Sequence, residues 1–224
     1  MFSVLLFDMI LIHNITNTIF TSKTYILYKK GFDSACLVDI GDIEPVLGFL
    51  DAHGLIVNRV LLTHAHFDHI YGLPHLTELF PDVRVYTNNA GRDALGNSRL
   101  NMSKYLDNPI TYESEKIEIC KEGTEIELFR GISAKVYETP GHHPSCLTFM
   151  VGDYLFTGDA FIPDVAVVTV LPGANKQQAA ASEKRILSLA EGKIVCSGHE
   201  ITHEIMSTKI KRNKKICYIS SHHW

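Results

Sequence analysis

The chain has 224 residues, of which 46% are hydrophobic, and a formal net charge of −4 at pH 7. This length and composition fit one sizeable globular domain with a large core. The slightly acidic balance argues against nucleic acid as the main partner, and no apolar run is long enough to span a bilayer. We therefore expect a soluble protein that makes no membrane contact.

The N-terminal segment 1–12 is apolar, which raises the alternative of a signal peptide. It lacks a basic start and a small-residue cleavage site, and Asp8 interrupts it, so a core strand is the better interpretation. Five scattered cysteines form no Cys-x-x-Cys pair: Cys36, Cys120, Cys146, Cys196 and Cys217. Such cysteines are typical of small buried residues in a reducing compartment. We predict a cytoplasmic protein.

The first half of the chain predicts strands that alternate with helices. One helix is expected after Asp42 as its cap, with Pro45 in its first turn and an end at Gly54. A second helix is expected over 69–79, where apolar residues recur at helical spacing, and a short third helix begins at Asn88. Strands are predicted near 3–12, 24–29, 34–39, 57–63 and 83–86.

The second half repeats this design with more strands. They are predicted near 117–119, 125–129, 133–138, 146–151, 154–157 and 193–197, with a helix from about 175 to 190. Two such halves imply an α/β fold with two mixed β-sheets face to face and helices on their outer sides, an αββα four-layer sandwich. We assign 1–205 to this single domain and 206–224 to a short basic tail that a solvated terminus explains.

The pattern richest in chemistry follows the apolar run 60–62. Three histidines and an aspartate occupy six consecutive positions: His64, His66, Asp68 and His69. The apolar run predicts a buried strand that ends in a turn, and such a turn can direct several side chains to one point. Imidazoles and carboxylates are ligands that Zn²⁺ and similar ions prefer. The spacing therefore predicts a metal site rather than a solvated histidine-rich loop.

The same design recurs three times downstream. A predicted strand, a glycine and a possible ligand follow one another at His142, Asp159 and His199. Glycine lets the backbone turn sharply and lets a metal ion and the chain approach closely. These three positions strengthen the prediction of a metal site built from distant segments.

In this order, the seven candidate ligands resemble those of the metallo-β-lactamase-fold hydrolases, over about residues 15 to 205. The resemblance implies the four-layer sandwich and two divalent metal ions per chain, Zn²⁺ first, with Fe or Mn as alternatives. It also implies that one ion takes His64, His66 and His142, that the other takes Asp68, His69 and His199, and that Asp159 bridges them.

The surrounding sequence is most similar to the glyoxalase II-type thioester hydrolases and their short bacterial relatives. Short segments similar to those of the relatives lie at 97–103, 139–142 and 171–173. The chain departs from these relatives at His143, where Thr is usual, and at Tyr71, where Gly is common. Because little of the chain follows the last candidate ligand, recognition of glutathione stays open.

The resemblance also implies a mechanism. Two metal ions about 3.5–4 Å apart would share one hydroxide, because coordination lowers the pKa of water towards about 7. This hydroxide would attack an acyl or phosphoryl centre. Asp68 is predicted both as a ligand and as an acceptor of the water's proton.

Several functions stay open at this point. The leading prediction is a hydrolase of a small acyl thioester or ester, whose apolar part would lie against the apolar loop 161–171. A phosphodiesterase or lactonase of the same fold and a non-catalytic metal-binding protein are the alternatives. No pattern indicates an oligomeric state.

Two further patterns compete with these predictions. His199, Glu200 and His203 match the His-Glu-x-x-His pattern of zinc metalloproteases, which requires a helix. Gly198 after an apolar strand instead predicts a turn at His199. His143 is predicted either as a group beside the ligands or substrate, or as a packing residue.

Overall fold

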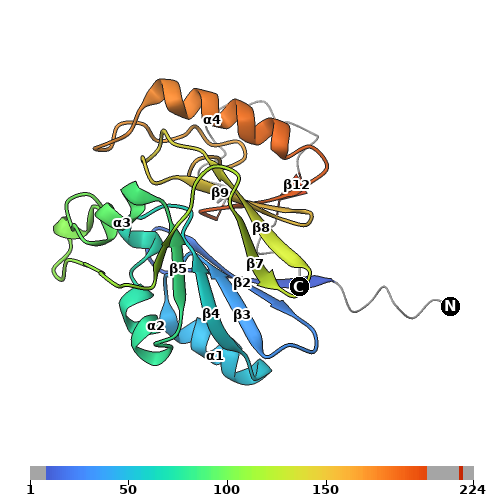
Figure 1. The fold of residues 1–224 in the computed structure, drawn as a ribbon. Coiled ribbons are helices and arrows are strands. Elements are labelled where there is room, and N and C mark those ends of the chain that lie inside the picture. The colour runs from blue at the N-terminus through green and yellow to red at the C-terminus, as the bar shows by residue number, and fades with distance from the viewer. Residues whose placement is uncertain (1–8, 201–216, 219–224) are drawn as a thin grey trace.

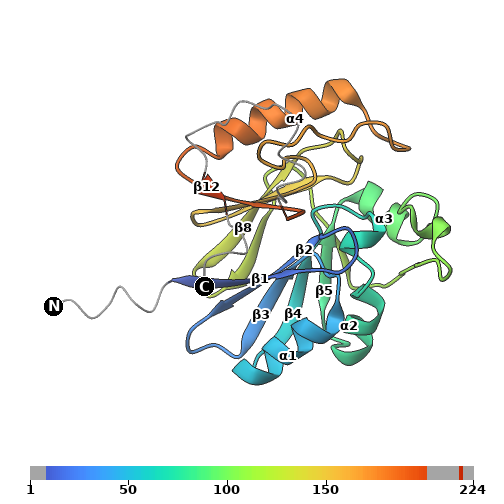
Figure 2. The same cartoon turned by 180° about the vertical axis from the view of Figure 1, so that it is seen from behind.

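The computed structural model describes residues 9–200 and 217–218. Two six-stranded sheets pack face to face, and helices cover their outer sides (Figures 1 and 2). This arrangement confirms the predicted αββα sandwich. In the described part, no helix is long and apolar enough to cross a membrane.

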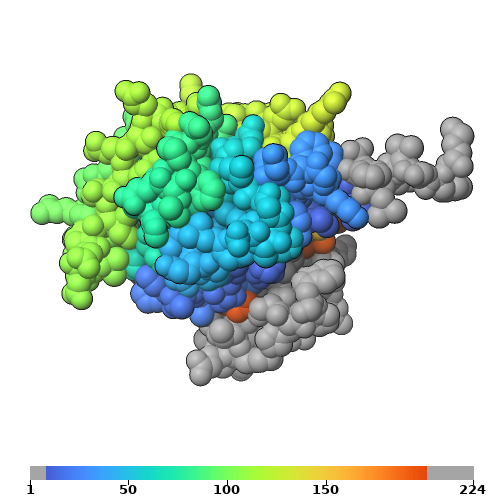
Figure 3. Space-filling view, turned by 90° about the horizontal axis from the view of Figure 1, so that it is seen from below, coloured from blue at the N-terminus to red at the C-terminus, as the bar shows by residue number. Residues whose placement is uncertain are grey.

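The first sheet takes its strands in chain order. They are β1 (Ile10–Thr16), β2 (Lys23–Lys29), β3 (Ser34–Val38), β4 (Ile56–Leu61), β5 (Arg84–Thr87) and β6 (Ile117–Ile119). The pairs from β1 to β3 are antiparallel and those from β3 to β6 are parallel. Its outer face carries α1 (Ile43–His53), α2 (Leu73–Leu79) and α3 (Asn89–Leu95). Figure 3 shows this side, with the blue and cyan residues around α1 at its centre.

The second sheet has the order β12-β11-β10-β9-β8-β7. Its strands are β7 (Glu125–Phe129), β8 (Ile132–Glu138), β9 (Leu147–Val151), β10 (Tyr154–Gly158), β11 (Ile194–Ser197) and β12 (Cys217–Tyr218). β11 pairs in parallel with β10 and with β12, while the pairs from β7 to β10 are antiparallel. Helix α4 (Lys176–Leu189) lies across the outer face (Figure 1).

Three apolar clusters fill the spaces between the four layers. The central cluster joins the sheets and includes Leu27, Leu61, Phe149 and Phe156. A second cluster lies between the first sheet and its helices, and a third lies beneath α4, around Ile186. Strand β4 contributes Val60 to the helix side and Leu61 to the sheet side, because successive residues of a strand point to opposite faces.

The helix predicted over 69–79 begins later than expected. Phe67–His69 form a 3₁₀ turn, and α2 starts only after Gly72. Pro74 explains the difference, because a proline inside a helix clashes with the carbonyl four residues earlier but is tolerated in the first turn. Gly72 also packs closely on the first sheet, since a Cβ there would lie 2.2 Å from the Gly41 carbonyl oxygen.

Asp42 precedes α1, but its carboxylate does not cap the helix as predicted. It accepts hydrogen bonds from the backbone N–H and hydroxyl of Thr18 (2.7 and 2.9 Å) and from the Tyr71 hydroxyl (2.5 Å). Tyr71 therefore ties the segment after the histidine motif to the loop that follows β1. The predicted end at Gly54 is confirmed, with a left-handed φ of 62°.

The first strand differs from its predicted bounds, and the structure describes only a small part of the predicted tail. The first strand runs to Thr16, beyond the predicted end at 12, while 1–8 lie outside the described residues. Within the predicted tail, Cys217–Tyr218 pair in parallel with β11. The basic run and His203 lie outside the described residues.

Candidate metal centre

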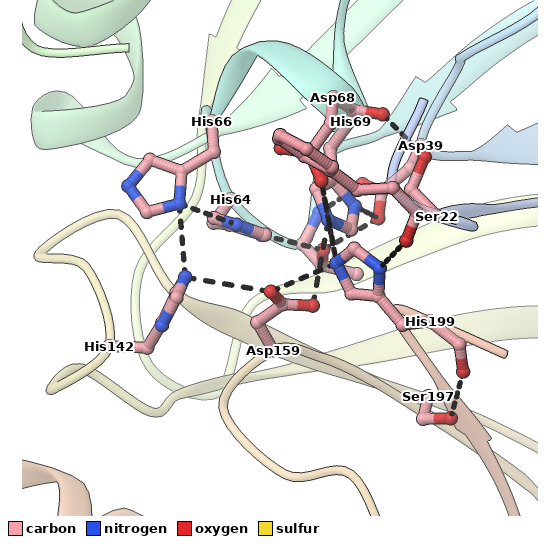
Figure 4. Close-up of polar contacts among 12 residues, drawn as sticks. Ser22, Asp39, His64, His66, Asp68, His69, His142, Asp159, Ser197 and His199 are labelled. Atoms are coloured by element: carbon pink, nitrogen blue, oxygen red, sulfur yellow. Dashed lines mark hydrogen bonds and ion pairs between the residues drawn. The ribbon is translucent and has the colours of Figure 1, made fainter. Parts of the chain in front are cut away.

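The seven candidate ligands come together at one edge of the molecule, where parallel strands of both sheets end. His64 to His69 follow β4, Asp159 follows β10, and His199 follows β11. The ends of adjacent parallel strands lie side by side, so side chains just beyond them meet. His142 comes from the loop after β8 and completes the cluster (Figure 4).

Two groups of side chains are visible in the cluster. In the first group, His66 Nδ1 lies 3.2 Å from His64 Nε2 and 3.0 Å from His142 Nε2. In the second, His199 Nε2 lies 3.3 Å from His69 Nε2 and 3.4 Å from Asp68 Oδ2. Within each group, one donor atom per residue lies within 4.8 Å of the others.

Asp159 lies between the two groups (Figure 4). Its Oδ2 is 3.6 Å from His142 Nε2 and 3.2 Å from His199 Nε2, and its Oδ1 is 3.5 Å from His69 Nε2. A carboxylate at this position can contact an ion in either group.

Hydrogen bonds on the outer side of the cluster orient three of the imidazoles. The Nδ1 atoms of His142 and His199 lie 2.9 and 2.8 Å from the carbonyl oxygens of Val168 and Phe20. His69 Nδ1 lies 2.9 Å from Asp39 Oδ2. Because a carbonyl or carboxylate oxygen only accepts, each Nδ1 carries the proton, which directs the Nε2 lone pair of the neutral ring into the cluster.

Burial and neighbouring charges shift the pKa values of two imidazoles in the cluster, His66 and His69, in opposite directions. Burial, with His142 and His143 nearby, lowers the pKa of His66 to about 2, so this imidazole is neutral. Burial also acts to lower the pKa of His69, but Asp68, Asp159 and Asp39 outweigh it and raise the value to about 10. Without a metal, His69 thus holds a second proton, which an ion would displace on binding.

One buried oxygen and one glycine test whether the cluster fits a cation. Asp159 Oδ1 is buried and has no hydrogen-bond partner among the residues that the structure describes. A Cβ on Gly198 would lie 2.2 Å from this oxygen, so only glycine leaves the space open. Five imidazoles and two carboxylates are also a donor set suited to Zn²⁺, Fe²⁺ or Mn²⁺. The residues present therefore fit divalent cations.

Comparison with known proteins agrees with this geometry. The family model described as the metallo-beta-lactamase superfamily matches residues 31–199, from just before β3 to the last candidate ligand. The chain belongs to the metallo-β-lactamase superfamily.

Curated relatives within the superfamily are named hydroxyacylglutathione hydrolase. The protein from Xylella fastidiosa (strain M12) is 35% identical over 170 residues, which are 75% of this chain and 56% of the relative. The protein of Vibrio vulnificus (strain YJ016), hydroxyacylglutathione hydrolase 1, is 29% identical over 178 residues, 80% of this chain and 62% of the relative. The chain thus spans little more than half the length of these relatives. The predicted similarity to glyoxalase II is confirmed.

Solved structures of the superfamily share the fold. The B3 metallo-β-lactamase BLEG-1 has a TM-score of 0.78 at 29% identity, over 85% of this chain and 92% of the other. The di-iron-bound form of TTHA1623 has a TM-score of 0.72, also at 29% identity, over 84% and 92% of the two chains.

The sequence patterns missed Asp39, which supports ligands in both groups. Its Oδ1 accepts the Thr63 backbone N–H (2.7 Å), and its Oδ2 accepts the Thr63 hydroxyl (2.7 Å) as well as His69 Nδ1–H. The Thr63 hydroxyl oxygen in turn lies 3.3 Å from His64 Nδ1. The available signal was an aspartate directly after β3, the strand adjacent to the motif-bearing β4.

The patterns also missed a buried ion pair beside His199. Lys23, only 1% exposed, forms a 2.5 Å ion pair with Glu200. Around it, the Lys23 backbone N–H donates to the Gly198 carbonyl and the Glu200 N–H to that of Thr21. These bonds join the two sheets next to the cluster. His199 itself lies outside any helix, as the predicted turn requires.

His143 connects the loop after β8 to the loop after β4, both of which carry candidate ligands. Its Nδ1 lies 2.6 Å from the Ser145 hydroxyl, which also accepts the Ala65 backbone N–H at 3.1 Å. The ring makes an edge contact with His66, at 4.8 Å between centroids. Burial and the neighbouring His142 lower the pKa of His143 to about 4, so the ring is neutral at physiological pH. His143 is thus a buried neighbour of the candidate ligand His66.

Proposed function

We propose that this chain is a dinuclear metal-dependent hydrolase that acts on a small acyl thioester or ester. The observation that carries the proposal is the convergence of seven donor side chains, six of them in two groups of three and the seventh, Asp159, between the groups. The curated relatives are named hydroxyacylglutathione hydrolase, which supports an acyl thioester as the substrate class.

In this proposal, His64, His66 and His142 hold one ion, Asp68, His69 and His199 hold the other, and Asp159 contacts both. Zn²⁺ is the first candidate for both ions. Iron is the alternative, because a structural neighbour has a di-iron-bound form. A cytoplasmic location remains part of the proposal.

Divalent ions in these groups would lower the pKa of water and polarise the scissile carbonyl. The chain's own part is to hold the imidazoles in position through the carbonyls of Phe20 and Val168 and the carboxylate of Asp39. In this proposal, Asp68 also accepts a proton from water. In the reaction, the water oxygen bonds to the acyl carbon, the C–S or C–O bond breaks, and the leaving group departs with a proton.

Elemental analysis together with a hydrolysis assay tests the proposal. The protein, purified without chelator, should contain two divalent ions per chain and should hydrolyse an S-acyl thioester. Asp159→Ala should lower both the metal content and the rate. Asp51→Ala, a change of the same kind at an exposed position of α1, should leave both unchanged.

A substrate panel separates this proposal from its alternatives. Hydrolysis of a bis-aryl phosphate or a lactone but of no thioester would move the chain to the phosphodiesterase or lactonase class. Two bound ions without hydrolysis of any of these substrates would favour a metal-binding protein. Fewer than two ions, unchanged by Asp159→Ala, would refute the dinuclear centre.

A further inference from the structure

The loop that joins β1 to β2, residues 17–22, contacts the second group of candidate ligands from outside. The Phe20 carbonyl accepts the hydrogen bond from His199 Nδ1 (2.8 Å). The Ser22 hydroxyl donates to the Asp68 carbonyl (2.7 Å), and Figure 4 shows Ser22 beside both ligands. His199 is the most exposed ligand of its group, with 17% of its side chain accessible. Its orientation therefore depends on the bond to this loop more than on packing.

The loop adopts a conformation that its own residues disfavour. Phe20 and Thr21 follow one another and both have a left-handed backbone, with φ at 54° and 56°. This conformation is uncommon for residues other than glycine and a genuine outlier for a β-branched residue such as threonine. It persists only where the surrounding structure imposes it. Contacts outside the loop are therefore needed to keep the Phe20 carbonyl directed at His199.

Asp42 and Tyr71 provide such contacts at the start of the loop. The Asp42 carboxylate accepts hydrogen bonds from the backbone N–H and the hydroxyl of Thr18 (2.7 and 2.9 Å). The Asp42 backbone N–H donates to the Asn17 side-chain oxygen (3.0 Å). The Tyr71 hydroxyl donates to the same carboxylate (2.5 Å) and so fixes its position. Two consecutive loop residues are thus fastened to the segment before α1 and to the segment after the histidine motif.

We propose that Tyr71 and Asp42 are positioning residues for the ion of the second group. They hold the β1–β2 loop in the conformation in which Phe20 orients His199. The inference rests on the proposed dinuclear centre and assigns these two residues a part in it. Since an ion binds well only when the imidazole is correctly placed, its apparent affinity falls with the fraction of the protein in that conformation.

The first group of ligands should not respond to the loop. Within the described part of the chain, none of its three imidazoles forms a hydrogen bond with the β1–β2 loop. Loss of the Tyr71 hydroxyl should therefore weaken the binding of one ion and leave that of the other unchanged. A general loss of stability would instead weaken both.

The test is a titration of the metal-free protein with Co²⁺, followed by visible absorption. His199→Ala identifies the binding step that belongs to the second group. Tyr71→Phe removes only a hydroxyl, and Tyr28→Phe is the matched control, because the Tyr28 hydroxyl makes no hydrogen bond among the described residues.

We expect the wild type and Tyr28→Phe to bind two ions per chain with the same affinities. Tyr71→Phe should weaken the step of the second group about tenfold, because a hydrogen bond to a charged acceptor is lost. Asp42→Ala, which removes all three bonds to the carboxylate, should weaken the same step further. Unchanged titration of Tyr71→Phe, or equal weakening of both steps, would overturn the inference.

A second change tests the role of backbone strain. Thr21→Gly, added to Tyr71→Phe, should restore most of the lost affinity, because glycine adopts the left-handed conformation without steric cost. A double variant that binds the second ion as weakly as Tyr71→Phe alone would contradict the proposed role of the anchor.

Thioester hydrolysis by the same proteins separates this inference from the proposed function. A selective effect of Tyr71→Phe on one ion without hydrolysis of any substrate would retain the positioning role and reject the hydrolase. Hydrolysis by a two-ion protein whose titration ignores Tyr71→Phe would retain the hydrolase and reject the positioning role. A wild type that binds fewer than two ions would reject both.

Discussion

Asp39 joins the two strands that lie behind the candidate ligands. One carboxylate accepts three hydrogen bonds, from the Thr63 backbone, the Thr63 hydroxyl and His69. Its backbone is left-handed, with φ at 57°, a conformation that aspartate adopts more readily than most residues. A single buried side chain thus orients one ligand directly and another through Thr63.

The first prediction concerns this carboxylate. Asp39→Asn should weaken metal binding about 10- to 100-fold, because an amide is a poorer acceptor for His69 Nδ1–H and no longer supports the ring's basicity. Competition with a chromophoric chelator measures the affinity. Asp33→Asn, at an exposed position just before the same strand, should leave the affinity unchanged. Equal affinities of the two variants would refute the role of Asp39.

A second prediction contrasts two glycines. Gly198→Ala should abolish normal metal binding, because the new Cβ would lie 2.2 Å from Asp159 Oδ1 and 3.0 Å from His69 Cε1. Gly48→Ala, in α1, meets no atom within 4 Å and should stabilise the protein by about 0.5–1 kcal/mol. Metal analysis and thermal unfolding of both variants provide the check. Full metal content in Gly198→Ala would contradict the geometry of the centre.

At the scale of elements, the contact between the start of β2 and the end of β11 closes the sandwich beside the metal centre. The Tyr25 hydroxyl donates to the Ser197 carbonyl (2.8 Å), and the Ser22 hydroxyl donates to the carbonyl of Asp68 (2.7 Å). The ion pair of Lys23 and Glu200 lies in the same contact. Both sheets and the histidine motif are therefore linked at one place.

The third prediction tests this ion pair. Lys23→Met should lower the free energy of unfolding by about 3 kcal/mol, because removal of one partner of a buried pair leaves the other charge poorly solvated. The double change Lys23→Met with Glu200→Met should recover much of that loss. Arg84→Met, in an ion pair whose side chains are 60% and 43% exposed, should cost less than about 1 kcal/mol. Denaturant unfolding measures all three, and similar losses for Lys23→Met and Arg84→Met would contradict the prediction.

The layers of the whole molecule shield its thiols. Cys36, Cys120, Cys146 and Cys196 are free and buried. Burial raises the pKa of Cys36 and Cys120 to about 12 and raises that of the other two as well. The reactive species is the thiolate, so these thiols react slowly in the folded protein.

The fourth prediction follows from this shielding. In the Cys217→Ser variant, a thiol reagent at pH 8 should label none of the four cysteines quickly, and all four should react after unfolding in denaturant. The slow phase should accelerate as the pH rises, because the thiolate fraction increases towards the raised pKa. Fast labelling of the folded variant would show that the sheets do not exclude solvent as the structure indicates.

Local sequence determined much of this protein. Alternating apolar residues predicted most of the strands, and the order of histidines, aspartates and glycines predicted which side chains converge, because each signal lies within a few neighbouring residues. The start of α2 was mispredicted although its cause, Pro74, is also local. For these features, periodicity and turn chemistry carry the information.

Only the tertiary structure decided the rest. The three-way acceptance by Asp39 and the pairing of Lys23 with Glu200 both join segments distant in the sequence. Asp42 shows the same limit. Its carboxylate does not cap α1 as expected but accepts hydrogen bonds from Thr18 and Tyr71. A local pattern fixes which groups a segment offers, but the partner of a buried polar group depends on which segment the packed layers bring within hydrogen-bond distance.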